Sequence, residues 1–442
     1  MRDNNTRFHT RNIFGNLYMR HTAARPESDV TLNLDFFNYR NSERQSMTDN
    51  MDTDIYGDMG GTTAGYVGAL DFRHTLSGHW HISGGLRCSY VTMDNDGRYS
   101  GQTSAADALG SDFKYSENVN AAYGEGRARY GRLTATMGLR IEQTNLSTIF
   151  SGNEATARTD YSDHAAQLFP SVSLSLDAGG GNNAALSYTK RITRPRYADL
   201  NPFIHIFDDI THVGGNIGLR PAVSHNVRAA WSHGSWLRVA MTATYTDNDI
   251  AKCYREISER LVYVSPENLP LRIGLSLNVA GVNIHVTKWW RLSASGSLLY
   301  ANYHFPKATG IAANCLFTPM ADIKNLFDFP HGWSAELSGS FRGPAAYGQA
   351  RVSASGNLYI GLRKSILGSR GNVTLYIRDL LNTNHSTSTI YLAGKCATII
   401  EREYEDMRLA GVSFALRFNA GKPHKYIPAK NNWTDEMNRV NL

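Results

Sequence analysis

The feature that most constrains the fold of this chain is an alternation of apolar and polar residues with a period of two. Residues 133–141 place leucine, alanine, methionine and isoleucine at every second position, with threonine, glycine and arginine between them. Successive side chains of a β-strand point to opposite faces, so the pattern predicts strands with one apolar and one polar face. The same pattern recurs at residues 82–90, 237–245, 292–300, 333–341 and 410–418.

The apolar residues are never gathered into one long stretch. No window approaches about 18 consecutive apolar residues, which excludes membrane-spanning helices. The mean hydropathy of −0.36 is by itself typical of a soluble chain. A strand of a membrane barrel meets lipid only at every second residue, however, so its average hydropathy also stays low. The 39 Gly, 23 Tyr and only 13 Pro among 442 residues suit strands and turns better than helices.

The connections between the alternating runs are of two kinds, which follow one another in turn. Short segments rich in Gly, Asn, Ser or Asp lie near 76–79, 177–183, 232–235, 328–331 and 366–370. Longer polar segments lie near 41–61, 94–111, 146–163, 195–221 and 246–258. Tight turns on one side of a membrane and long loops on the other are typical of transmembrane barrels. The apolar faces also end in aromatic residues, which favour the membrane–water interface: Tyr90, Tyr245, Tyr300, Trp333 and Phe418.

These patterns together predict an all-β protein, a large antiparallel transmembrane β-barrel. We expect residues 1–420 to form this barrel with about 17 strands, and residues 421–442 to form a C-terminal tail.

A longer motif lies in the segment 188–226, between two of the expected strands. Its residues are Tyr188, Arg191, Arg194, Pro195, Leu200, Asn201, Pro202, Phe203, Gly215, Asn216, Leu219, Pro221, Ser224 and Asn226. In order and spacing they resemble a stretch in the barrels of TonB-dependent receptors and related outer-membrane proteins of the Bacteroidota. Ile217 and Ala222 depart from the Pro and Glu that are usual there. Further resemblances lie at 138–144, 169–171 and 378–383, so that the likeness covers about residues 60–430.

The resemblance implies the C-terminal barrel portion of a receptor in the outer membrane of a Gram-negative cell. Such a barrel has about 22 strands, so about five strands and the plug domain would be missing on the N-terminal side. The polar start, MRDNNTRFHT, has no apolar core of a signal peptide, which also indicates a fragment. The implied function is ligand binding and active import of an unidentified substrate. The implied partners are outer-membrane lipid, a TonB-type energy-transducing protein that touches the plug, and a surface lipoprotein.

No constellation of residues indicates catalysis, and we expect no enzymatic activity, no cofactor and no metal. The polar faces carry charged residues that we expect to face the lumen and to pair with one another or with a plug: Arg87, Arg140, Arg238, Glu336 and Arg417. Contact between these residues and a ligand is the second interpretation. The loops 94–111, 146–163 and 195–221 are better candidates for ligand contact. The net charge of +6 comes from scattered residues, so nucleic-acid binding is not indicated.

Some weaker sequence patterns could indicate metal sites, but each also has a purely structural explanation. His79 and His81 could place two imidazoles on one strand face, but Trp80 between them suits an interfacial turn. The acidic stretches 208–209 and 401–406 could bind Ca²⁺ in an outside loop, but ordinary solvation is the favoured interpretation. The cysteines Cys88, Cys253, Cys315 and Cys396 form no CxxC pair. We interpret Cys88 as a small hydrophobe on an apolar strand face.

Two other functions stay open at this stage. A passive, porin-like outer-membrane channel would have the same barrel without a plug, and the upstream sequence distinguishes it from a receptor. A soluble β-rich adhesin or sandwich would have the same alternation, and its solubility without detergent distinguishes it from both.

Overall fold

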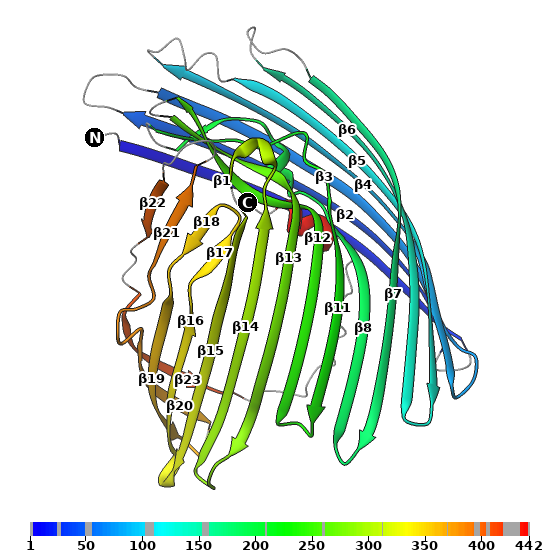
Figure 1. Ribbon diagram of the computed structural model, residues 1–442, viewed down its shortest axis with the longest axis vertical. Coiled ribbons are helices and arrows are strands. Elements are labelled where there is room, and N and C mark those ends of the chain that lie inside the picture. The colour runs from blue at the N-terminus through cyan, green and yellow to red at the C-terminus, as the bar shows by residue number, and fades with distance from the viewer. Residues whose placement is uncertain are drawn as a thin grey trace.

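The computed structural model describes residues 3–23, 28–48, 55–101, 110–152, 159–207, 210–258, 261–311, 313–368, 370–392, 398–403, 407–418 and 434–440. Most of these residues are β-strand, arranged as one curved antiparallel wall with a smaller sheet at one end (Figure 1).

The wall consists of strands that follow one another in chain order, each antiparallel to the next. They are β1 (Asp3–Thr22), β2 (Asp29–Thr48), β3 (Ile55–Thr75), β4 (Trp80–Gly101), β5 (Ser111–Tyr130), β6 (Leu133–Gly152), β7 (Thr159–Gly179), β8 (Asn182–Thr193), β11 (Ala222–His233), β12 (Leu237–Ser258), β13 (Leu261–His285), β14 (Trp290–His304), β15 (Asn314–Phe329), β16 (Trp333–Arg342), β19 (Ser355–Ile366), β20 (Gly371–Arg378) and β23 (Leu409–Leu416). With the short β9 (His205–Ile206) and β10 (Thr211–Val213) they make a sheet of 19 strands in the described residues. Without β9 and β10, the wall has 17 strands in the described residues, in agreement with the expectation of about 17.

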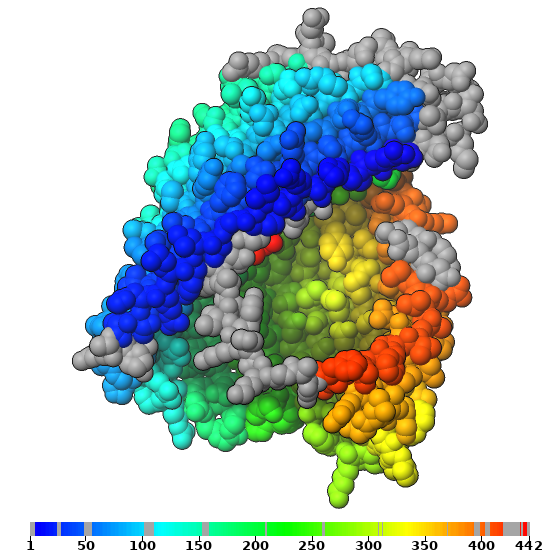
Figure 2. All heavy atoms as spheres, turned by 180° about the vertical axis from the view of Figure 1, so that it is seen from behind, coloured from blue at the N-terminus to red at the C-terminus, as the bar shows by residue number. Residues whose placement is uncertain are grey.

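The two edges of the wall are β1 and β23, and no pairing joins them within the described residues. Figure 2 shows the wall curving around a hollow, with β1 in dark blue crossing one side of it. The predicted all-β, antiparallel barrel architecture is confirmed, as a wall that does not close on itself in the described part of the chain.

The outer face of the wall carries a continuous apolar belt. The strand register places Leu70 opposite Leu86 and Met241 opposite Leu277, and both Leu86 and Met241 are 58% exposed. Further exposed members are Leu34, Ile141, Leu168, Leu186, Leu298, Ile323, Leu337, Ile360 and Leu375. A large exposed apolar surface marks an interaction site, and a belt around a barrel is the surface that a bilayer covers.

Aromatic side chains lie at both ends of this belt. Near the short turns, Trp80 packs edge-on against Tyr130, with ring centroids 6.1 Å apart. The expected interfacial residues Tyr90, Tyr245, Tyr300, Trp333 and Phe418 all lie on the strand face that carries the belt, or continue it beyond the last strand. Because aromatic rings favour the membrane–water interface, these residues mark the two edges of the expected lipid zone.

The two ends of the wall differ in the way that the sequence predicted. Tight turns such as Gly180-Gly181 join the strands at one end, whereas long connections lie at the other. The strands are longer than their polarity suggested, since β4 continues to Gly101 and β6 continues to Gly152. Beyond the apolar belt both faces of a strand can meet water, so polar residues do not end the pairing there.

The long-loop end also carries a second sheet in the described residues, formed by β17 (Ala345–Tyr347), β18 (Ala350–Val352), β21 (Ser386–Tyr391) and β22 (Thr398–Glu403). β21 and β22 form a hairpin within the long connection between β20 and β23. Short helical segments are α2 (Tyr197–Leu200), η1 (Lys307–Thr309), η2 (Pro330–Gly332) and α3 (Thr434–Val440). Within the described ranges, no helix has the length and apolar character needed to cross a membrane.

Candidate functional site

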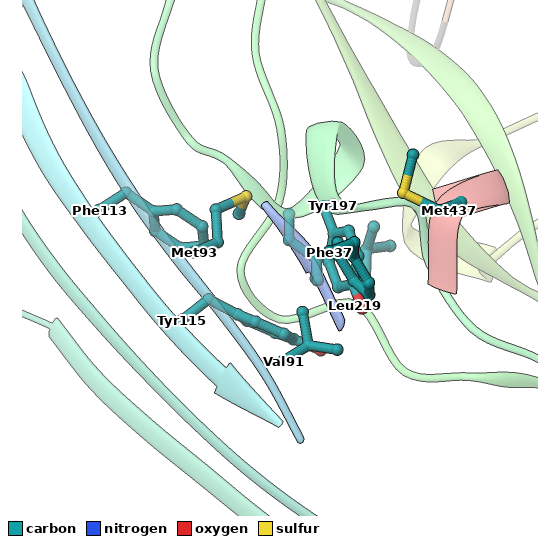
Figure 3. Close-up of a cluster of buried hydrophobic side chains, with 9 residues drawn as sticks. Phe37, Val91, Met93, Phe113, Tyr115, Tyr197, Leu219 and Met437 are labelled. Atoms are coloured by element: carbon teal, nitrogen blue, oxygen red, sulfur yellow. The ribbon is translucent and has the colours of Figure 1, made fainter. Parts of the chain in front are cut away.

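The segment between β8 and β11, residues 194–221, folds into the bore instead of extending outward, and we call it the motif loop. It contains α2, β9 and β10. Its apolar residues reach the inner face of the opposite part of the wall, where Tyr197, Leu200 and Leu219 join a buried cluster with Phe37 of β2 and Val91 of β4. Figure 3 shows Tyr197, Phe37 and Leu219 packed together at the centre of this cluster. The sequence motif therefore specifies a loop that lies across the lumen.

Phe203 is the second anchor of the motif loop. It is 4% exposed and stacks on Tyr99 of β4, with ring centroids 5.4 Å apart. A Cβ atom at Gly97 would lie 2.2 Å from the Phe203 ring, so glycine at that wall position makes room for the ring. The Oδ1 atom of Asn201 accepts a hydrogen bond of 3.2 Å from the backbone N–H of Phe203, which fixes the turn that carries the ring.

The glycine and the asparagine of the motif close the loop on itself. A Cβ atom at Gly215 would lie 2.3 Å from the carbonyl oxygen of Asn201, so only glycine allows this approach of the two backbones. The N–H of Asn216 donates to the Asp199 carbonyl at 2.7 Å. The Nδ2 atom of Asn216 donates to the Pro266 carbonyl at 3.2 Å, which links the loop to the wall.

The loop is also attached to the outer end of β13 through its backbone. β10 pairs parallel with Val262–Val264, and the N–H of Gly214 donates to the Val264 carbonyl at 3.0 Å. Asn268 of β13 both accepts from the Arg220 N–H and donates to the Arg220 carbonyl, each at 2.8 Å. The loop is therefore held on two sides of the bore, by side-chain packing at β2–β5 and by hydrogen bonds at β13.

Arg194, the first residue of the motif loop, enters a row of buried charges on the inner wall. It forms an ion pair with Glu142 of β6, and its Nε atom lies 3.6 Å from Oε1 of Glu117 on β5. Arg140 also pairs with Glu142 at 2.8 Å. The side chains of Glu117 and Glu142 are only 5% and 4% exposed. Because burial of an unpaired carboxylate is costly, these guanidinium partners are required for the wall to keep both charges.

A cavity of about 270 Å³ lies between the motif loop and the wall. It is lined by polar and apolar side chains, among them Tyr39, Asn41, Glu43, Asn95, Arg196, His205 and Phe203. Burial lowers the pKa of His205 and raises the pKa of Tyr197, because each loses water that would stabilise its charged form. The cavity offers hydrogen-bond donors and acceptors beside aromatic surface, a combination that suits small polar ligands.

The expected lumen-facing residues have different surroundings. Arg87 contacts the carboxylate of Glu436 at 2.8 Å, and Glu336 contacts Lys324 at 2.8 Å. Arg238 pairs with Ala280 in the strand register, on the inner face, and Arg417 lies just beyond β23. Together with Arg140, the charges that have described ion pairs are therefore balanced within the chain. Their suggested contact with a ligand stays a prediction.

The weaker candidates gain little support. The ring of His79 stacks on Tyr130 and that of His81 contacts the hydroxyl of Thr75, so the two imidazoles have separate neighbours. No group of three possible metal-binding side chains occurs in the described residues. Residues 208–209, Asp406 and Cys396 lie outside the described residues. The three described cysteines are free, with Cys88 exposed on the outer face.

Sequence reasoning missed several residues that build this site. Glu117 and Tyr115 are isolated polar residues in strands, and no sequence signal marks them. Glu142 lies in the 138–144 stretch, whose resemblance was noticed without the ion pairs that explain it. The 378–383 motif was noticed without its reason. Asp379 is 1% exposed, and its carboxylate accepts hydrogen bonds from the backbone N–H groups of Thr383 and Asn384, so the motif fixes the turn after β20.

Solved structures with the same fold are known receptors and transporters. The ferric yersiniabactin uptake receptor FyuA from Yersinia pestis matches with a TM-score of 0.66 at 13% identity, over 93% of this chain and 62% of that one. The siderophore receptor PiuA from Acinetobacter baumannii matches with a TM-score of 0.59 at 10% identity, over 92% and 64%. The copper transporter OprC matches with a TM-score of 0.58 at 12% identity, over 88% and 64%.

This chain thus spans less than two thirds of the structures that it matches. No curated protein matches it in sequence. The expected likeness to TonB-dependent receptor barrels is confirmed for the fold. A family model for outer-membrane β-barrel proteins matches residues 21–415, which is most of the chain. The chain therefore belongs to the outer membrane protein beta-barrel family, and it is a multi-strand protein of the outer membrane rather than an enzyme.

Proposed function

We propose that this chain forms the barrel of an outer-membrane receptor that binds a small polar ligand beneath its outer mouth and takes part in active import of that ligand. The observation that carries the proposal is the motif loop, which crosses the lumen and encloses a cavity of about 270 Å³ against the wall. A loop that only shielded the outer mouth would need no such contact with the inner wall.

The lining of the cavity supports a ligand rich in hydrogen-bonding groups. Asn41 and Asn95 offer amides, Glu43 offers a carboxylate and Arg196 offers a guanidinium, each near the outer end of the bore. Amides both donate and accept hydrogen bonds, so they suit hydroxyl, carbonyl and carboxylate groups alike. By name, the matching structures include a ferric yersiniabactin uptake receptor, a siderophore receptor and a copper transporter. A metal chelate is accordingly the first ligand class to test.

Active import needs further parts, which we propose for the intact protein. A plug domain would close the bore, and a TonB-type protein would act on that plug to release the ligand inward. A surface lipoprotein could deliver the ligand at the outer mouth, and lipid would cover the apolar belt. The lumen around the motif loop is the place where a plug and a ligand would meet.

An uptake experiment tests the proposal and separates it from a passive channel. Cells with and without the intact gene are given labelled ferric chelates, cobalamin, oligosaccharides or peptides, with and without an uncoupler of the proton gradient. We expect gene-dependent accumulation above the outside concentration, which the uncoupler abolishes. Gene-dependent uptake that only equilibrates, and that the uncoupler does not change, would instead identify a passive channel.

A variant pair locates the ligand once it is known. Asn41→Ala with Asn95→Ala removes two amides from the cavity lining, and Lys114→Ala removes a charge that pairs outward with Asp94 on the same wall. We expect the double variant to weaken ligand binding about tenfold or more, and Lys114→Ala to leave it unchanged. Equal binding by all three proteins would place the ligand elsewhere.

A further inference from the structure

The C-terminal helix α3 (Thr434–Val440) lies inside the bore, on the inner face of the wall. Figure 2 shows this segment in red within the hollow, and Figure 1 places it behind β12. Glu436 and Met437 are buried there. Asn438, which lies between Met437 and Arg439 in the sequence, is exposed. One face of this short helix therefore packs against the wall.

The guanidinium of Arg439 contacts four different groups of the bore. Its Nη1 donates to Glu117 at 2.5 Å, its Nη2 donates to the Tyr115 hydroxyl at 3.2 Å, and its Nε donates to the Pro195 carbonyl at 2.9 Å. The centre of the guanidinium lies 4.3 Å from the centroid of the Tyr197 ring. A carboxylate, a hydroxyl, a carbonyl and an aromatic face together match the planar, fully charged group of arginine better than the ammonium of lysine.

Without Arg439, the negative charge of Glu117 on the inner wall is only partly balanced. Glu117 is 5% exposed, and apart from Arg439 its described ion-pair partner is Arg194, whose Nε lies 3.6 Å away. Arg194 is already paired with Glu142. Because one guanidinium then serves two buried carboxylates, a second cation beside Glu117 is favourable. The inner wall thus has an excess of buried negative charge at Glu117 that a cation from another segment can balance.

Two further contacts orient the helix in this site. Glu436 accepts from Nη2 of Arg87 with both carboxylate oxygens, at 2.9 and 2.8 Å. Met437 packs into the cluster that contains Tyr197 and Leu219 (Figure 3). The helix therefore presents an acid, an apolar residue and a base to three matching groups, which fixes both its position and its direction.

We propose that the inner wall carries a binding site for a guanidinium-bearing segment, and that the C-terminal segment of this chain is its ligand. The site is built from Glu117, Tyr115, Arg87, Tyr197 and the Pro195 carbonyl. Since Pro195 and Tyr197 belong to the motif loop, α3 also holds that loop across the bore. A plug or a ligand that enters the bore at this depth must therefore displace the C-terminal segment.

Hydrogen exchange measured by mass spectrometry on the full chain in detergent tests the proposal. In Arg439→Ala and in Glu117→Gln we expect the amides of residues 434–440 to exchange about tenfold faster or more, because a charged hydrogen-bonded pair is lost. The exchange rate of these amides in Arg439→Lys should be close to the rate in Arg439→Ala. Asn438→Ala, at an exposed position of the same helix, is the matched control and should exchange like the unchanged chain. Equal exchange in all variants would overturn the proposal.

Small guanidinium compounds separate a guanidinium site from general packing. At the same concentration, methylguanidinium should raise the melting temperature of the Arg439→Ala chain more than methylammonium does. With the unchanged chain, the two compounds should change the melting temperature equally. If the variants fail to fold, arginine amide added to the unchanged chain should speed exchange at 434–440 more than lysine amide. If each guanidinium compound acts no more strongly than its ammonium counterpart in both assays, the inner wall has no preference for guanidinium and the proposal is overturned.

Discussion

The motif loop and the second sheet, β17–β18–β21–β22, both arise from long connections at the same end of the wall, but different forces fix them. The motif loop is held mainly by buried apolar side chains and by close approach of backbones, as at Phe203 and Gly215. The second sheet also buries apolar residues, such as Ala346 beside Leu269 and Tyr303, but most of its side-chain hydrogen bonds to the wall come from single polar residues. Asn314 of β15 is 5% exposed and donates to the carbonyls of Gly348 and Ala350.

Two further hydrogen bonds link the second sheet to the wall. The Oε1 atom of Gln349 accepts from the N–H of Tyr254 at 2.5 Å, and the hydroxyl of Thr318 donates to the Pro344 carbonyl at 2.8 Å. The comparison teaches why only one of the two regions has a recognisable motif. Packing against a crowded lumen demands particular residues in a particular order, whereas single hydrogen bonds to carbonyls accept almost any backbone.

The largest expected effect in this comparison is that of Phe203→Ala. Loss of a buried phenylalanine ring should weaken the packing of the motif loop by about 3 to 5 kcal/mol. Phe207→Ala, at a residue of the same loop that is 69% exposed, is the control. Hydrogen exchange of residues 197–207 should become much faster in the first variant only. Similar exchange in both variants would mean that apolar packing does not hold the loop.

Gly215→Val should have the next largest effect. Its Cβ would overlap the Asn201 carbonyl, so the two backbones must separate, at a cost of about 3 kcal/mol. Gly126→Val is the control, because a Cβ at Gly126 meets nothing within 4 Å. Limited proteolysis should cut the motif loop of Gly215→Val and spare that of Gly126→Val. Resistance of both variants would show that the loop adapts without cost.

Asn314→Ala should weaken the second sheet by about 2 kcal/mol, since buried carbonyls lose their donor. Asn314→Asp keeps the oxygen that accepts from Nε of Arg351 at 2.9 Å, but it sets a second carboxylate oxygen against the two carbonyls, so its effect should be at least as large. The rate of amide hydrogen exchange at residues 345–352 measures the effect of both variants on the second sheet. A change at the motif loop in either variant would contradict the separation of the two regions.

The smallest expected effect is a pH dependence of the motif loop. Burial lowers the pKa of His205 below its ordinary value of 6.5. Above that value the imidazole is neutral whether the loop is packed or released. As the pH falls below it, the released form takes up a proton first, so packing weakens by at most about 1.4 kcal/mol per pH unit.

The measurement compares exchange of the motif loop on the two sides of that value, corrected for the intrinsic pH dependence. His205→Gln removes the titrating group and should abolish the difference. Persistence of the full pH dependence in His205→Gln would assign it to another group.

Much of the barrel could be predicted from the sequence because the alternation of apolar and polar residues in each strand indicates which face is apolar and which is polar. The apolar rows of residues 133–141 and 237–245 lie on the outer face, as their alternation predicted. Arg87 and Arg140 lie on the inner face for the same reason. The order of the motif residues also indicated that 194–221 is a special loop, although nothing in that order showed that it turns inward.

The sequence by itself determined the strand pattern, the outer and inner faces, the alternation of turns and loops, and the family, because these depend on neighbours along the chain. The tertiary structure alone decided that Glu117 and Glu142 share the cations Arg194, Arg140 and Arg439, residues up to 322 positions apart. Such pairing depends on the curvature of the wall, which brings its inner face, the motif loop and the C-terminal helix to one point. No local pattern encodes that curvature, since it results from the register of all the strands together.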